Sequence, residues 1–300
     1  MPKHRKKLIM SKNLKIVVLA KQVPDTRNVG KNAMTPEGTV NRAALPAIFN
    51  PEDMNALEQA LRIKDLYPDT QLLLLTMGPT RAADIIREGI FRGADGGILL
   101  SDRKFAGSDT LATSYAISRA LKKINPDIII AGRQAIDGDT AQVGPQVAEK
   151  LNIPQVTYAE DIMELASGRI VIKRRLERGV EIVSSSLPLL ITVHATAPAC
   201  RPRNAKQVMK YKYARTASED SAPGANYVLP LDDYKYLKIE EWGVNNIEGD
   251  DNSFGLAGSP TKVKKIENIV FQAKQAKKYS ASESDIDSLM LELIESHTIG

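Results

Sequence analysis

The segment Gly132–Gly144, which reads GRQAIDGDTAQVG, carries the residue types best suited to hold an anionic ligand. Gly138 and Gly144 would allow backbone N–H groups to approach a ligand closely, because glycine has no side chain in the way. The side chains in this segment that could donate further hydrogen bonds are those of Arg133, Thr140 and Gln142. This combination favours the binding of a phosphate group.

The position of Pro145 indicates how this segment is held. Proline is tolerated only in the first turn of a helix, so a helix should begin between Ala141 and Gly144. Its N-terminus would offer unpaired N–H groups and a favourable field to an anion. The apolar run Asp127–Ala131 predicts a buried strand just before the segment, and ligands of open α/β sheets bind at the carboxyl ends of strands. Physical reasoning alone leaves two interpretations open, a nucleotide site and an ordinary capped loop.

Residues elsewhere give little support for covalent or metal chemistry. Cys200 stands beside Arg201, which could lower the pKa of its thiol, but the sequence assigns it no histidine partner. A single cysteine also excludes an internal disulfide and a cysteine-built metal cluster. Asp137 and Asp139 could perform acid–base chemistry, but their neighbours are more typical of a binding loop. No Walker A motif and no dinucleotide glycine motif follows the first predicted strand. We therefore expect no catalytic residue and no metal site.

Composition and charge argue against nucleic acid and membranes. The net charge is +5, but the basic residues Lys3, Arg5, Lys6 and Lys7 at the start of the chain supply most of it, so the remainder is nearly neutral. Aromatic residues make up 5% of the chain, which leaves few platforms for stacking bases. No apolar run approaches the roughly 20 residues of a membrane span. A secretory signal is not recognisable, and we expect a cytoplasmic protein.

Strand and helix patterns alternate through the first two-thirds of the chain, which predicts a parallel sheet covered by helices. Buried strands are predicted over 15–20, 71–76, 97–100 and 127–131, and helices follow most of them. After Pro154 the pattern changes to strands alone, at 155–157, 169–174, 180–185 and 187–193. We interpret these four as an antiparallel extension of the same sheet.

The chain is expected to divide into a basic tail (1–13), an α/β domain (14–215), a loop-rich linker or insertion (216–258) and a C-terminal arm (259–300). Within the arm, Ser282 and Asp285 form a candidate helix cap. An apolar stripe follows at helical spacing, made of Ile286, Leu289, Met290, Leu293 and Ile294. This helix would pack either on its own domain or in the groove of a partner.

Together with Gly132–Gly144, several motifs in the same order resemble electron transfer flavoprotein beta subunits. The matching stretches are Lys15–Asp25 (KIVVLAKQVPD), Asn50–Leu61, Leu75–Pro79, Pro154–Thr157 and Gly258–Val263. The resemblance implies a Rossmann-like, mostly parallel sheet of the adenine-nucleotide-binding type with an antiparallel extension and a C-terminal arm. It also implies a heterodimer with a flavin-bearing alpha subunit.

The resemblance further implies an adenine-nucleotide site in this chain. Its residues would be Leu19, Asn50, Asp53, Thr76, Met77, Gly132, Arg133, Gln134, Ala135, Ile136, Asp137, Gly138, Asp139, Thr140, Ala141, Gln142, Val143 and Gly144. The basic stretch after Cys200 matches the region where the family docks flavin dehydrogenases. The residues expected to dock such a partner are Arg203, Lys206, Val208, Met209 and Lys210. This stretch is shorter than in the family and lacks its common leucine or isoleucine anchor.

The segment Ser101–Ser114, combined with Ala135–Gln142, resembles the electron-bifurcating members of the family. This implies that the site holds FAD, with Asp109, Thr110 and Thr113 as additional ligands, and that NAD(H) is the electron donor. One electron would pass to the alpha-subunit flavin and the other to ferredoxin or flavodoxin, so any oxidoreductase activity would belong to the complex. Two alternatives stay open: a non-bifurcating carrier with structural AMP, and an adenylating enzyme on a related fold. Helix capping alone is the alternative role for Asp109.

Overall fold

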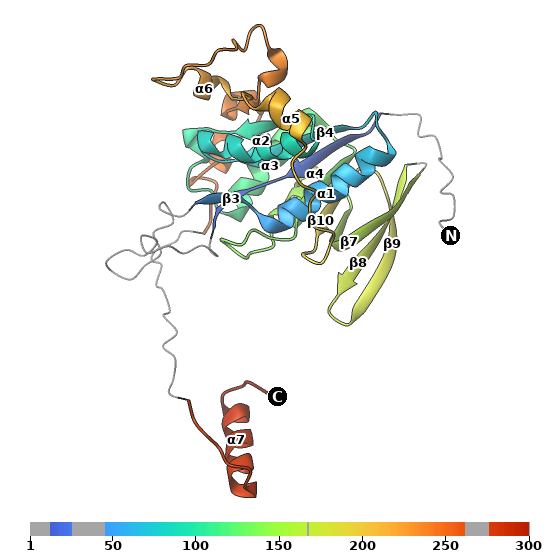
Figure 1. Ribbon diagram of the computed structural model, residues 1–300, viewed down its shortest axis with the longest axis vertical. Coiled ribbons are helices and arrows are strands. Elements are labelled where there is room, and N and C mark those ends of the chain that lie inside the picture. Colours follow the sequence, from blue (N-terminus) through green and yellow to red (C-terminus); the bar gives the residue numbers. More distant parts are fainter. Residues whose placement is uncertain (1–12, 26–45, 167, 262–275, 300) are drawn as a thin grey trace.

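The structure is a computed structural model that describes residues 13–25, 46–166, 168–261 and 276–299. These residues form an α/β fold around a nine-stranded sheet of order β11-β5-β4-β1-β6-β10-β7-β8-β9 (Figure 1). Neighbouring strands run parallel from β11 to the start of β7, and β7, β8 and β9 are antiparallel to one another in turn. The α/β class with a mostly parallel sheet, predicted from the sequence, is confirmed.

The parallel part of the sheet lies where the apolar runs predicted it. Its strands are β1 (Lys15–Leu19), β4 (Gln71–Met77), β5 (Gly96–Leu100), β6 (Ile128–Gly132), β10 (Leu189–Val193) and β11 (Glu240–Trp242). The antiparallel strands are β7 (Gln155–Ala166), β8 (Arg169–Leu176) and β9 (Gly179–Ser186), and β2 (Gln22–Pro24) pairs separately with β3 (Ala47–Phe49). The helices are α1 (Pro51–Leu66), α2 (Ala83–Arg92), α3 (Thr110–Ile124), α4 (Val143–Leu151), α5 (Ala205–Tyr211), α6 (Ala217–Asp220) and α7 (Glu283–Glu295).

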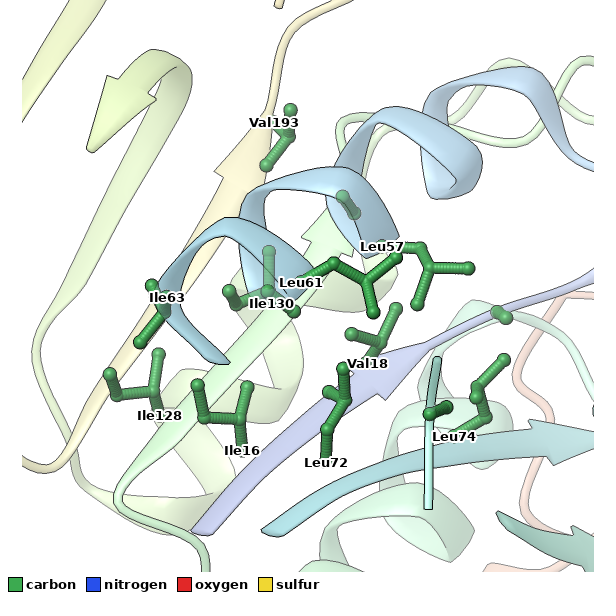
Figure 2. Close-up of a cluster of buried hydrophobic side chains, with 14 of the residues drawn as sticks. Ile16, Val18, Leu57, Leu61, Ile63, Leu72, Leu74, Ile128, Ile130 and Val193 are labelled. Carbon is green, nitrogen blue, oxygen red and sulfur yellow. The ribbon is translucent and has the colours of Figure 1, made fainter. Parts of the chain in front are cut away.

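Helices cover both faces of the parallel strands, so alternate residues of each strand enter different hydrophobic clusters. Ile16 and Val18 of β1 pack with residues of α1, among them Leu57 and Leu61 (Figure 2). Val17 and Leu19 belong to the cluster on the opposite face, which contains residues of α3 and α4. Because both faces are buried, the strands read as continuous apolar runs rather than as alternating ones.

The position of β10 corrects the predicted antiparallel extension. β7, β8 and β9 form it as expected, but β10 lies parallel between β6 and β7 in the body of the sheet. All residues of β10 are buried. A strand covered on both faces belongs to the helix-covered part of the sheet, whereas β9, at the edge, has no buried residue.

The segment 216–258 is loop-rich, as expected, and it also adds to the sheet. Its strand β11 pairs parallel with β5. Leu237, Ile239, Val244 and Phe254 are buried against the domain. The segment therefore packs as part of the α/β body, while the domain boundaries themselves stay a prediction.

Helix α7 is separated from the sheet in Figure 1, and none of its residues is buried. It begins where the sequence predicted, because the Ser282 hydroxyl accepts a hydrogen bond from the backbone N–H of Asp285. Among the described residues, none of the helices has the length and apolar character that crossing a membrane requires.

Candidate functional site

A cavity of about 420 Å³ lies at the carboxyl edge of the parallel strands, where β1, β4 and β6 end. The N-terminus of α3 and the loop between β6 and α4 complete its wall. The cavity brings together most of the residues proposed from the sequence: Leu19, Asp53, Met77, Asp109, Thr110, Thr113, Gly132, Arg133, Gln134, Ala135, Gly138, Asp139, Thr140, Ala141, Gln142, Val143 and Gly144.

The proposed residues that do not line the cavity are Asn50, Thr76, Ile136 and Asp137. Strand geometry keeps the Thr76 side chain out of the cavity wall, because successive side chains of a strand point to opposite faces of the sheet. Its neighbours Leu75 and Met77 line the cavity instead. Thr76 is buried, and its hydroxyl has no hydrogen-bond partner among the described residues.

Sequence reasoning missed part of the wall, namely Ala20, Lys21, Leu75, Phe105, Gly107, Ile117 and Ala131. Ala20 and Lys21 directly follow β1, so the rule that ligands bind beyond strand ends would have found them. Phe105 and Gly107 lie within the stretch Ser101–Ser114 that carries the resemblance, but only the tertiary fold brings this segment after β5 to the cavity.

Asp53 joins the ends of two strands to the first turn of α1. Its buried carboxylate accepts hydrogen bonds from the backbone N–H groups of Lys21 (2.8 Å) and Gly132 (3.1 Å). Burial raises the pKa of Asp53 to about 7, although the side chain of Asn50 and these two N–H groups favour the ionised form. The position of this corner of the cavity wall therefore depends on one buried carboxyl group.

The raised pKa of Asp53 predicts a pH-dependent stability. Between pH 4 and 7 the unfolded chain loses the proton from this carboxyl group while the folded chain keeps it, so the stability present at low pH is lost as the pH rises. Asp53→Asn removes this titration. As the pH rises from 4 to 7, the free energy of unfolding of the wild type should therefore fall relative to that of the variant, by up to about 4 kcal/mol. Urea unfolding at several pH values measures it, and a difference that is constant with pH would contradict the assignment.

Glu52 and Asn50 hold the first part of the loop from behind. Glu52 is buried, pairs with the Arg133 guanidinium (2.9 Å) and accepts a hydrogen bond from the backbone N–H of Gln134 (3.0 Å). Asn50 precedes α1 as predicted but makes no capping hydrogen bond. Its side chain instead donates to the carbonyl of Gln134 (2.9 Å) and accepts from the N–H of Ile136 (3.2 Å). Arg133, expected to be a free donor for a ligand, is thus engaged with Glu52.

The middle of the loop holds two residues in an unfavourable backbone conformation. Asp139 (φ 49°) and Ala141 (φ 53°) lie in the left-handed region, a backbone conformation that residues other than glycine rarely adopt. The Gln134 side chain donates to the Asp139 carboxylate (2.8 Å), and the Ala135 carbonyl accepts from the Asp139 N–H (2.9 Å). Such strain concentrates at ligand sites, where the surrounding structure maintains it.

The two glycines of the loop have different roles. A Cβ at Gly144 would lie 2.8 Å from Cγ2 of Thr192, so Gly144 is required for packing of α4 against β10. A Cβ at Gly138 would meet nothing within 4 Å. The described part of the chain therefore gives no packing reason for glycine at 138, and the absence of a side chain there leaves room beside the loop for a ligand.

The N-terminus of α3 forms the opposite wall. Asp109 caps this helix by accepting hydrogen bonds from the N–H groups of Leu111 and Ala112, and its second oxygen accepts from the Thr261 hydroxyl (2.6 Å). Slight burial opposes ionisation, but these hydrogen bonds hold the pKa of Asp109 below its usual range. Both carboxylate oxygens are occupied, so Asp109 acts here as a cap and as an anchor for the segment containing Thr261.

Helix α4 begins at Val143, inside the predicted window. Its approach to α3 is fixed by the Thr110 hydroxyl, which donates to the Gln142 side chain (2.9 Å). The cavity between these helices joins a polar side, made by the loop, to an apolar side made by Leu75, Met77, Phe105 and Ile117. This arrangement suits a ligand that combines a flat apolar ring with an anionic group.

Two further features bear on the chemistry. Burial, together with the charge of Glu58, raises the pKa of the Cys200 thiol to about 11. The neighbouring arginines therefore do not make Cys200 a nucleophile at neutral pH. In the described part of the chain, no group of His, Cys, Asp and Glu side chains is arranged to hold a metal ion.

The residues expected to dock a partner lie on and beside α5, which packs against α2. Arg203 pairs with Glu88 of α2 at 2.5 Å. Lys206, Met209 and Lys210 are exposed, and Met209 is exposed to 67%. Val208 is half-buried. The structure therefore presents one apolar side chain between two lysines on this surface.

Comparisons with known proteins show which family this chain is similar to. The model of the electron transfer flavoprotein domain matches residues 37–217. The electron transfer flavoprotein subunit beta of Megasphaera elsdenii is 42% identical over 260 residues, 84% of this chain and 87% of its own. The acryloyl-CoA reductase electron transfer subunit gamma of Anaerotignum propionicum is 43% identical over 95% of this chain and all of its own. Subunit CarD of the caffeyl-CoA reductase-Etf complex of Acetobacterium woodii is 48% identical over 60% of this chain and 68% of its own.

Proposed function

Because this chain belongs to the electron transfer flavoprotein family and is similar to its beta subunits, we propose that its cavity binds FAD and that it takes part in NADH-dependent electron bifurcation. The observation that carries the proposal is the two-sided cavity between the 132–144 loop and the N-terminus of α3. The resemblance of Ser101–Ser114 and Ala135–Gln142 to bifurcating members supports FAD over AMP.

The residues of the cavity fit such a group. The open space at Gly138 gives room for a diphosphate beside the loop, and the N-terminus of α4 offers it a favourable field. Phe105 and Ile117 would cover an apolar ring from the other side. Bound FAD would supply hydride acceptance from NADH and transfer of single electrons, while the protein positions it and sets its electrostatics.

The nucleotide content of the purified complex tests this function. The full chain is produced with its alpha subunit, and the bound nucleotides are released by denaturation and separated by chromatography. Two FAD per heterodimer without AMP would support the proposal. One FAD and one AMP would make the chain a non-bifurcating carrier, and a complex without any nucleotide beyond the alpha-subunit flavin would refute a nucleotide site here.

The proposed partners are the alpha subunit, a flavin dehydrogenase, and ferredoxin or flavodoxin as the low-potential acceptor. The exposed stripe of α7 supports contact with the alpha subunit, since Ile286, Met290 and Ile294 are each about half exposed and such a stripe is usually covered. The surface around Met209 supports docking of the dehydrogenase. Two relatives are named as parts of CoA reductase complexes, which agrees with a partner of that kind.

Removal of residues 280–300 is expected to weaken association with the alpha subunit, because it removes the apolar stripe of α7. Loss of about three apolar side chains from the interface, at roughly 1.5 kcal/mol for each, corresponds to an affinity reduced about a thousandfold. Sedimentation or calorimetric titration measures the effect. The variant carrying Ser288→Ala, on the same helix, is the matched control and should bind as the wild type does.

A further inference from the structure

The backbone of Lys21 is held by hydrogen bonds at the rim of the cavity. Its backbone N–H donates to the buried Asp53 carboxylate (2.8 Å), and its carbonyl accepts from the N–H of Asn50 (3.0 Å). Its ammonium group reaches across to the loop, where both oxygens of Asp137 lie 2.8 Å from Nζ. The Lys21 backbone is thus held in place, while its side chain carries an ammonium group along the cavity wall.

The cationic side chains that line the cavity, all within the described residues, are Lys21 and Arg133. Arg133 is committed to Glu52, which is buried and would be left as an uncompensated charge if Arg133 turned toward a ligand. Lys21 is less constrained. Its side chain is 49% exposed and that of its partner Asp137 is 18% exposed, against 9% for Glu52. Exchanging Asp137 for another anion therefore leaves behind a carboxylate that water still reaches.

The cavity also needs this cation. Asp109 and Asp139 line it, and each carboxylate would repel a phosphate group. Apart from Arg133, which is paired with Glu52, the donors of the loop are backbone N–H, amide and hydroxyl groups, which carry no net charge. The lysine ammonium offers three donors and a full positive charge.

From these contacts we propose that Lys21 binds the phosphate group of the cavity's ligand and that Asp137 competes with the phosphate for the same ammonium group. The inference rests on the proposed nucleotide site and names the charged residue that selects phosphate there. It has a distinctive consequence. Removing the lysine should weaken phosphate binding, whereas neutralising its present partner should strengthen it.

The test uses the full chain in complex with its alpha subunit, after dialysis to remove bound nucleotide, with ADP and adenosine as probes in calorimetric titrations. Lys21→Gln is expected to weaken ADP binding roughly tenfold, as for loss of a charged hydrogen bond. Asp137→Asn is expected to strengthen ADP binding by about threefold. Binding of adenosine, which lacks phosphate, should change with neither variant.

The matched control is Lys238→Gln, because Lys238 is 45% exposed and pairs with Glu240 at 3.2 Å outside the cavity wall. It should bind both probes as the wild type does. If Lys21→Gln and Asp137→Asn weaken ADP and adenosine alike, the pair only holds the loop and the inference is wrong. Unchanged ADP binding by Lys21→Gln also overturns it. If the wild type binds neither probe, the proposed nucleotide site fails, and the role of Lys21 fails with it.

Discussion

Replacement of Gly132 by alanine is expected to destabilise the protein by about 3 kcal/mol, the upper end for added volume in a packed interior. A Cβ at this position would lie 2.8 Å from the backbone N of Asp53 and 2.8 Å from the backbone C of Glu52, and it would also collide with the Asp53 carboxylate. Two of these atoms belong to the backbone of α1. The collision can therefore be relieved only by moving the helix away from the end of β6.

Urea unfolding of Gly132→Ala against the wild type measures this loss. The matched control is Gly138→Ala in the same loop region, where the new methyl group meets nothing within 4 Å. Its free energy of unfolding should stay within about 1 kcal/mol of the wild-type value, since glycine replacement at an unstrained position is neutral to stabilising. Equal stabilities of the two variants would contradict the prediction, because they would show that α1 can move away from the end of β6 at little cost in free energy.

Gly138→Val is expected to abolish nucleotide retention while leaving the heterodimer assembled. The reason is that a Cβ at Gly138 meets no atom of the described residues within 4 Å, so a valine there occupies the room proposed for the ligand. A side chain that fills the space proposed for the nucleotide should lower the affinity for the nucleotide roughly tenfold to a hundredfold. The measurement is nucleotide content of the purified complex, with thermal unfolding recorded beside it.

A graded series sharpens this second prediction. Gly138→Ala adds one methyl group and should retain part of the nucleotide, while Gly138→Val adds three carbon atoms and should retain almost none. Normal nucleotide content in the valine variant would remove Gly138 from the site. Loss of the heterodimer in that variant would indicate that the loop serves assembly rather than binding.

Much of the fold is encoded in local patterns. The apolar run of β1 predicts a strand buried on both faces, and Pro145 limits the start of α4 to the few residues that include Val143. These features depend on the chain's own stereochemistry, because proline fits only the first helical turn. Ser282 marked the start of α7 correctly because its hydroxyl caps the helix by a hydrogen bond within the same turn.

The sequence was less informative where a residue's role depends on distant neighbours. β10 reads as one more apolar strand, and only its pairing with β6 and β7 distinguishes a parallel central strand from an antiparallel one. Thr76 was assigned to the site from its motif, but the alternation of β4 excludes it from the cavity wall. The three residues of β11 are too few to carry a periodic signal.

By itself, the sequence determined the family and the α/β alternation, and it predicted the loop 132–144 as the binding segment, since each is expressed by residues close together in the chain. The tertiary structure alone decided that Gly132 must be bare against Asp53, that Arg133 is occupied by Glu52, and that Lys21 faces Asp137. Those roles arise from contacts between residues far apart along the chain. Steric exclusion and ion pairing act through space, and folding brings together what the linear order separates.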